Sequence, residues 1–203
     1  MTSIITGDIT NSRKVHSTAW IEGLKKILAT TGKNPTTWEI YRGDEFQVEV
    51  AVPEEALLLA LQIKAYMKTT KLDVRMSIGI GEKTYNAKKI SESNGSAFIR
   101  SGELFETLKK QKVTLAINSG NIKLDQEINL MLRLGLVFMN NWLPQSAEFV
   151  LTAIENRSAS QEEIGVRLGI NQAAVSRRQK RAQFDLMMEL ESYFRQKIKT
   201  LSE

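Results

Sequence analysis

The feature that most constrains the fold is the order of short alternating runs and longer helical patterns through residues 1–117. Apolar residues with period two predict strands, and apolar residues at three-to-four spacing predict helices. The order is strand, helix, strand, strand, helix, strand, at residues 3–6, 14–31, 36–41, 46–50, 53–71 and 73–80. Such a split βαβ arrangement places the first strand beside the following hairpin in one antiparallel sheet, with both long helices on one face.

Two acidic motifs lie where these strands end. Gly-Asp-Ile at 7–9 closes the first strand, and Arg-Gly-Asp-Glu at 42–45 forms the tip of the hairpin. The predicted topology brings Asp8 and Asp44 together, and without a cation their repulsion raises the pKa of one of them. Because Mg²⁺ keeps several waters, two carboxylates and the phosphates of a nucleotide suffice to hold it. The alternative is that both acids only cap turns.

The same stretches carry a resemblance to a known fold. Residues 7–9, 43–46 and 75–81 resemble the conserved stretches of the palm-type catalytic domain of class III nucleotidyl cyclases and GGDEF diguanylate cyclases. With Asn-Ser-Arg at 11–13, the whole chain most resembles the SatD family, which joins a palm-like N-terminal half to a half resembling DNA-binding proteins. The resemblance implies an α+β protein: a ferredoxin-like palm (nucleotidyl-cyclase-like) domain followed by an all-α helix-turn-helix domain.

The resemblance also implies which atoms bind metal: the carboxylates of Asp8 and Asp44 and the carbonyl of Ile9. The candidate nucleotide-binding residues around them are Gly7, Arg13 and Gly43. Gly7 permits close approach of a ligand to the backbone, and Arg13 follows Asp8 closely enough to contact a phosphate.

Other positions depart from the cyclase pattern. Cyclases of this fold use an asparagine and an arginine on the helix after the glycine-rich strand, where this chain has Ile99 and Glu103. GGDEF enzymes carry a second glycine where this chain has Arg42. The sequence therefore predicts a metal site without the residues that perform cyclisation, and it predicts a solvated role for Glu45.

The C-terminal half is helical. A largely apolar helix is predicted at 126–142, ended by Pro144, and the next helix at 147–156. Apolar residues occupy most of the circumference of the first, so it is buried or docked between domains. Residues 161–178 resemble the bacterial helix-turn-helix pattern, with a capping box from Ser160 to Glu163 and Gly-Ile-Asn as the turn. The predicted domains are a palm-like domain at 1–122, a connecting helix at 123–145 and a helix-turn-helix domain at 146–203.

The basic charge of the chain gathers on the second helix of this motif. The net charge is +5, and residues 171–181 contain four basic residues and no acid. The candidate DNA contacts are Gln172, Ala173, Ser176, Arg177 and Lys180 for base edges, and Arg178 and Arg181 for the backbone. The alternative is a vestigial or protein-binding module. The N-terminal half of the last helix, 182–201, is predicted to pack in the core of the motif, and the rest of that helix is a candidate dimer seam.

Composition excludes several classes of site. The chain has no cysteine, which excludes a thiolate metal site. Its single histidine, His16, lies on a polar stretch, which argues against a histidine-rich metal site and a Ser-His-Asp triad. No run is long enough to span a membrane, and no secretory signal is evident, which favours a cytoplasmic protein. We therefore expect a homodimeric DNA-binding regulator whose palm-like domain senses a nucleotide with Mg²⁺. The alternatives are a nucleotidyl-transfer or cyclase-type enzyme and a dimeric scaffold.

Overall fold

The computed structural model describes residues 1–202, except for the side chains of Lys14 and Ser202; residue 203, the last of the predicted helix-turn-helix domain, lies outside the described residues. A mixed sheet of five strands has the order β2-β3-β1-β4-β5. The strands are β1 Thr2–Thr10, β2 Trp38–Tyr41, β3 Glu45–Val50, β4 Asp73–Gly81 and β5 Leu115–Asn118. β1 pairs antiparallel with β3 and β4, and β5 runs parallel to β4. The α+β class and the pairing of the first strand with the hairpin are thus confirmed.

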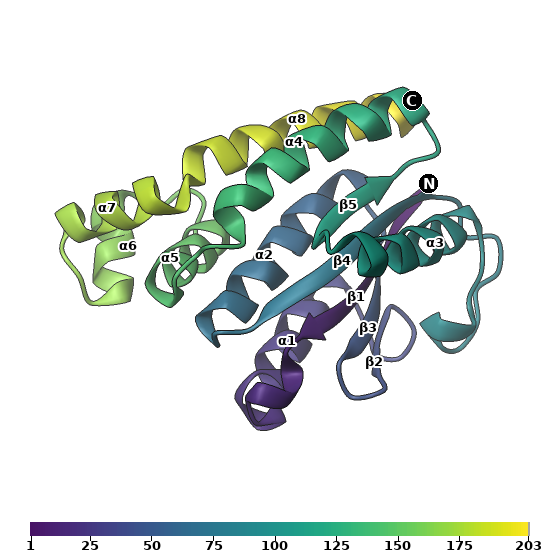
Figure 1. Cartoon of the computed structure of the whole chain (residues 1–203), viewed down its shortest axis with the longest axis horizontal. Helices are drawn as coiled ribbons and strands as arrows, with labels where there is room; N and C mark the ends of the chain where they lie inside the picture. Colours follow the sequence, from purple (N-terminus) through teal and green to yellow (C-terminus); the bar gives the residue numbers. More distant parts are fainter. Residues whose placement is uncertain (203) are drawn as a thin grey trace.

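Helices cover both faces of the sheet. α1 (Ile21–Leu28) and α2 (Ala56–Thr69) pack on one face, and α3 (Ser96–Gln111) covers the other (Figure 1). The single helix predicted over 14–31 is wrong, because short 3-10 turns precede and follow α1. Serine, threonine and histidine at 16–18 have low helix propensity, which accounts for the late start.

The glycine-rich strand β4 lets α3 approach the sheet closely. A Cβ on Gly79 would lie 2.3 Å from the carbonyl oxygen of Ala97 and 2.4 Å from the backbone nitrogen of Ser101. The Ser101 hydroxyl donates to Thr6 Oγ1 at 2.8 Å, and the Ser77 hydroxyl donates to the Ser101 carbonyl at 2.8 Å. Gly79 therefore serves helix packing here, because it lets α3 lie close to β4.

The C-terminal half consists of helices α4 to α8. They are α4 Ile122–Met139, α5 Pro144–Glu155, α6 Gln161–Leu168, α7 Gln172–Ala182 and α8 Phe184–Ser202. Pro144 does not end the preceding helix as predicted; α4 ends at Met139, and Pro144 lies in the first turn of α5, where a missing backbone N–H costs nothing. Among the described residues no helix is both long and apolar enough to cross a membrane.

One hydrophobic core runs through both halves of the chain. It joins residues of the sheet and of α2 to residues of α4, α5 and α8. α5 packs on α2, and the Trp142 indole N–H donates to the Ala182 carbonyl at 3.0 Å, which ties the segment after α4 to the end of α7. The predicted boundaries after 122 and 145 fall near the starts of α4 and α5, but the core crosses both.

Candidate functional site

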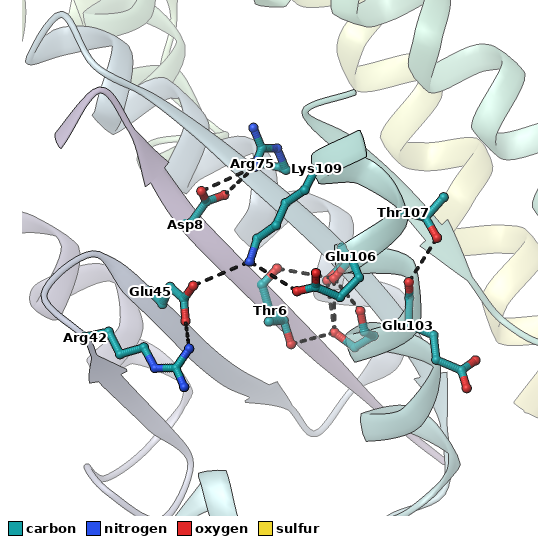
Figure 2. Close-up of polar contacts among 11 residues, drawn as sticks. Thr6, Asp8, Arg42, Glu45, Arg75, Glu103, Glu106, Thr107 and Lys109 are labelled. Atoms are coloured by element: carbon teal, nitrogen blue, oxygen red, sulfur yellow. Dashed lines mark hydrogen bonds and ion pairs between the residues drawn. The ribbon is translucent and has the colours of Figure 1, made fainter. Parts of the chain in front are cut away.

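Asp8 lies near the end of β1 between two charged neighbours. It stands directly opposite Glu45 of β3 and Arg75 of β4 in the sheet register. Directly opposed residues in a sheet project from the same face. Figure 2 shows Asp8 turned toward Arg75, while Lys109 of α3 reaches down over the sheet toward Glu45. Strand register, and not proximity in sequence, assembles this group.

The contact between Asp8 and Arg75 is loose. Arg75 Nη1 lies 3.4 Å and 3.5 Å from the two carboxylate oxygens, beyond the usual range for a charged hydrogen bond. Arg75 Nε is buried and has no hydrogen-bond partner. Burial raises the pKa of the Asp8 carboxyl, and the opposing effects of Arg75 and Lys109 do not offset it. The hydrogen-bonding capacity of the Asp8 carboxylate and the Arg75 guanidinium is therefore poorly satisfied within the protein.

Lys109 and Glu45 are residues of this site that the sequence did not indicate. Lys109 Nζ lies 3.5 Å from Glu45 and 3.1 Å from Glu106, and 4.5 Å from the centre of the Phe105 ring. The Glu45 side chain is 20 % exposed and also pairs with Arg42 at 3.7 Å. The solvated role predicted for Glu45 is thus wrong. Its position opposite Asp8 follows only from the strand register.

Asp44 has partners of its own at the hairpin tip. The Ser12 hydroxyl donates to Asp44 Oδ2 at 2.6 Å, and the Ile9 backbone N–H donates to the Asp44 carbonyl at 3.0 Å. The negative charge of Asp44 is one of the lesser contributions to the raised pKa of Asp8, so the two acids interact electrostatically. In the described part of the chain, no cluster of three or more histidine or acidic side chains is arranged to hold a metal.

The other predicted residues around the acids differ in their surroundings. A Cβ on Gly7 would lie 2.5 Å from the Phe46 ring, so Gly7 is required by core packing. Gly43 has φ 89° and open space where a Cβ would be, and Arg13 is exposed on a 3-10 turn. Ile99 and Glu103 are exposed on α3. Gly43 and Arg13 are therefore accessible to a ligand, whereas Gly7 is not.

Local capping signals define the helix-turn-helix segment as predicted. Ser160 and Glu163 form the reciprocal capping box at the start of α6. Gly169 ends α6 in the left-handed region with φ 64°, and the Asn171 side chain accepts from the Ala174 N–H at the start of α7. A Cβ on Gly165 would lie 2.6 Å from the Ile170 carbonyl oxygen. A small residue is therefore needed where the turn folds back on α6.

The predicted DNA-contacting residues of α7 fall into two groups. The exposed ones are Gln172, Ala173, Arg177, Lys180 and Arg181, and Ser176 is half-buried. Arg178 instead pairs with Glu148 of α5 at 2.7 Å and is 19 % exposed. Arg178 thus anchors α7 to α5, a tertiary contact that the local sequence does not reveal.

No protein-family model matches the chain, and no curated protein matches it significantly.

Proposed function

We propose that the protein is a DNA-binding transcriptional regulator that places α7 in the major groove. The observation that carries this proposal is the exposed face of α7. It presents Arg177, Lys180 and Arg181, the helix contains no acid, and Val175 and Ala182 on its other side are buried. A basic, acid-free face on the second helix of such a motif supports contact with phosphates and base edges.

Side chains near the start of α7 supply the sequence-specific contacts in this proposal. Gln172 pairs with adenine, Ala173 and Ser176 contact neighbouring bases, and Arg177 pairs with guanine or a phosphate. Lys180 and Arg181 contact the backbone. Because Arg178 is paired with Glu148, it orients α7 instead of binding a phosphate directly.

The test is selection of bound fragments from a random duplex pool, followed by titration of the selected site at several salt concentrations. Arg177→Gln should lower the steepness of log K against log salt by about 0.9 if it contacts one phosphate. Arg178→Gln, the matched control on the same helix, should leave that slope unchanged. Failure to recover any preferred sequence would overturn the proposal.

We further propose that the sheet half is a ferredoxin-like palm domain that binds a nucleotide with Mg²⁺. The strand order β2-β3-β1-β4 supports this proposal. The donor set fits the ion, because carboxylate and carbonyl oxygens are the hard ligands that Mg²⁺ prefers. Asp8, Asp44 and the Ile9 carbonyl would hold it, and Arg13 and Gly43 would face the phosphates. The observation that favours binding here is the loose Asp8–Arg75 contact with an unpartnered Arg75 Nε.

A panel of nucleoside triphosphates with Mg²⁺ tests this second proposal by thermal shift. A ligand present at a hundred times its Kd should stabilise the fold by about 2.7 kcal/mol. Asp8→Asn and Asp44→Asn should each abolish the shift, whereas Glu103→Gln, an exposed acid on α3, should preserve it. No shift with any nucleotide would overturn nucleotide sensing. Conversion of ATP or GTP to a product would favour the enzymatic alternative, a nucleotidyl transferase or cyclase-type enzyme.

A further inference from the structure

The outward surface of α4 and α8 is apolar. Residues 126–142 were predicted to be buried or docked between domains, but α4 keeps one apolar face exposed. Leu130, Leu134 and Val137 are 51 %, 64 % and 69 % exposed, and Leu186 of α8 is 54 % exposed. The spacing of the three α4 residues places them on a single face. The predicted burial therefore does not extend to this side of the helix.

A groove lies beside this row of exposed side chains. It has a volume of about 480 Å³ and lies between α4 and α8. Its apolar lining is Met131, Leu134, Phe138, Leu186, Leu190 and Tyr193, so Leu134 and Leu186 of the exposed row form its rim, and Leu130 and Val137 lie outside it. Gly135 has no side chain to fill the groove, and a Cβ at this position would lie 3.7 Å from Leu190 Cδ2. A projecting ridge and a groove of matching chemistry thus lie next to each other on one surface.

We propose that this α4/α8 face, the exposed residues Leu130, Leu134, Val137 and Leu186 with the adjoining groove, binds a second copy of the same chain. A two-fold dimer brings one patch against the identical patch. A ridge beside a groove satisfies that requirement, because each ridge enters the partner's groove. Contiguous apolar surface of this kind usually marks an interaction site.

The dimensions of the face suit a dimer. α4 and α8 have 18 and 19 residues and lie side by side (Figure 1). They run in opposite directions, since Tyr193 contacts Glu127 whereas Ala182 contacts Trp142. At 1.5 Å per residue the strip is about 27 Å long, and two helices make it about 20 Å wide. Two such footprints of roughly 500 Å² give about 1,000 Å² in total, which reaches the lower limit for a specific interface.

Charged residues on α4 and α8 favour one orientation of the two copies in the dimer. Arg133 lies on the side of α4 that faces β5 and the end of α3, where it lines two cavities outside the groove. Glu189 lies on the α8 side and lines the groove itself. A two-fold axis parallel to the helices lays the outer side of α4 on α8 of the other copy. Arg133 then faces the partner's Glu189, and the contact occurs twice.

The same axis has a consequence for α7. α6 and α7 lie at one end of the paired α4 and α8 helices (Figure 1). An axis parallel to α4 and α8 keeps both copies of α7 at that end of the dimer, where one duplex can meet both. This consequence rests on the proposed DNA binding, since dimeric helix-turn-helix proteins read half-sites about one helical turn apart.

Sedimentation equilibrium of the full chain without DNA tests the interface separately from DNA binding. The wild type should reach twice the mass of the 22.9 kDa chain. Leu134→Glu should weaken dimerisation by roughly 100-fold or more, because it buries an unpaired carboxylate in the interface. Ile99→Glu, at a 53 % exposed apolar position on α3, is the matched control and should leave the dimer intact. Thermal melting establishes that each variant folds.

A charge exchange tests the orientation. Glu189→Arg should weaken the dimer, and adding Arg133→Glu to it should restore the wild-type affinity. A monomeric wild type, or equal effects of Leu134→Glu and Ile99→Glu, would overturn the interface. Loss of affinity in the double exchange would overturn the parallel axis. A dimer broken by Leu134→Glu that selects no DNA sequence would support this inference and refute the proposed function.

Discussion

Asp73 and Asp8 both meet basic side chains at the same end of neighbouring strands, but their contacts differ in quality. Asp73 accepts from Lys64 Nζ at 2.8 Å and lies 2.7 Å from Lys68 Nζ. Among the described residues, the one ion pair of Asp8 is with Arg75, at 3.4 Å or more. Burial raises the pKa of both acids, but the two lysines overcome it at Asp73, whose pKa is lowered, whereas the pKa of Asp8 stays raised.

This difference indicates that the Asp73 cluster stabilises the fold. The Asp73 cluster joins parts of the chain that must stay together. Lys64 is wholly buried on α2 and also reaches the Thr114 hydroxyl at 3.4 Å, and Lys68 donates to the Asn140 carbonyl after α4. Burial lowers the pKa of Lys64 to about 8, so its charge depends on Asp73. The Asp8 cluster joins α3 to the sheet through longer contacts, and its unsatisfied groups are those expected where a ligand completes the bonding.

The largest expected contrast is between Asp73→Asn and Asp8→Asn. Asp73→Asn leaves the buried Lys64 without a counter-charge and should cost about 3–5 kcal/mol of unfolding free energy. Asp8→Asn removes a carboxylate whose ionisation is disfavoured in the folded protein, so stability at pH 7 should be unchanged or higher. Urea denaturation of both variants measures the two values. Equal losses would show that the Asp8 cluster also stabilises the fold.

A smaller contrast separates the lysines of the two clusters. Lys68→Met removes a 2.7 Å contact with Asp73 and the hydrogen bond to Asn140, and should cost about 1.5–3 kcal/mol. Lys109→Met removes longer contacts with Glu45 and Glu106 and should cost less than about 1 kcal/mol. Urea denaturation of both variants measures these losses. A larger loss for Lys109→Met than for Lys68→Met would reverse our assignment of the two clusters.

Sequence predicts the parts of this molecule that depend on local signals. The capping box of Ser160 and Glu163 and the turn at Gly169 form as predicted, because each uses residues within one turn of a helix. The pairing of β1 with the hairpin also follows from alternation and strand order. These features need no knowledge of which distant residues meet.

Sequence misses the contacts that depend on register and on helix placement. Arg75 faces Asp8 only because β1 and β4 pair in one particular register. Lys109 reaches Glu45 only because α3 crosses the sheet closely over Gly79. Arg178 binds Glu148 across two helices, although its neighbours on α7 suggested a phosphate contact. In each case tertiary packing determines which residue is the partner. The residue type alone does not show it.

The smallest expected effect is a pH dependence that distinguishes the two aspartates by sign. The pKa of Asp8 is raised above 3.8, so its contribution to stability is fully present below pH 3.8 and is lost as pH rises through its folded value. The pKa of Asp73 is lowered, so its contribution is present above 3.8 and is lost as pH falls. Relative to the wild type, Asp8→Asn should therefore gain stability as pH rises from 3.8 toward neutrality. Asp73→Asn should lose stability relative to the wild type as pH rises toward 3.8, through the window below that value, and the deficit should then stay constant above it. Unfolding free energies measured for the three proteins at closely spaced pH values give both differences, and differences of the same sign would mean that Asp8 is as firmly paired as Asp73.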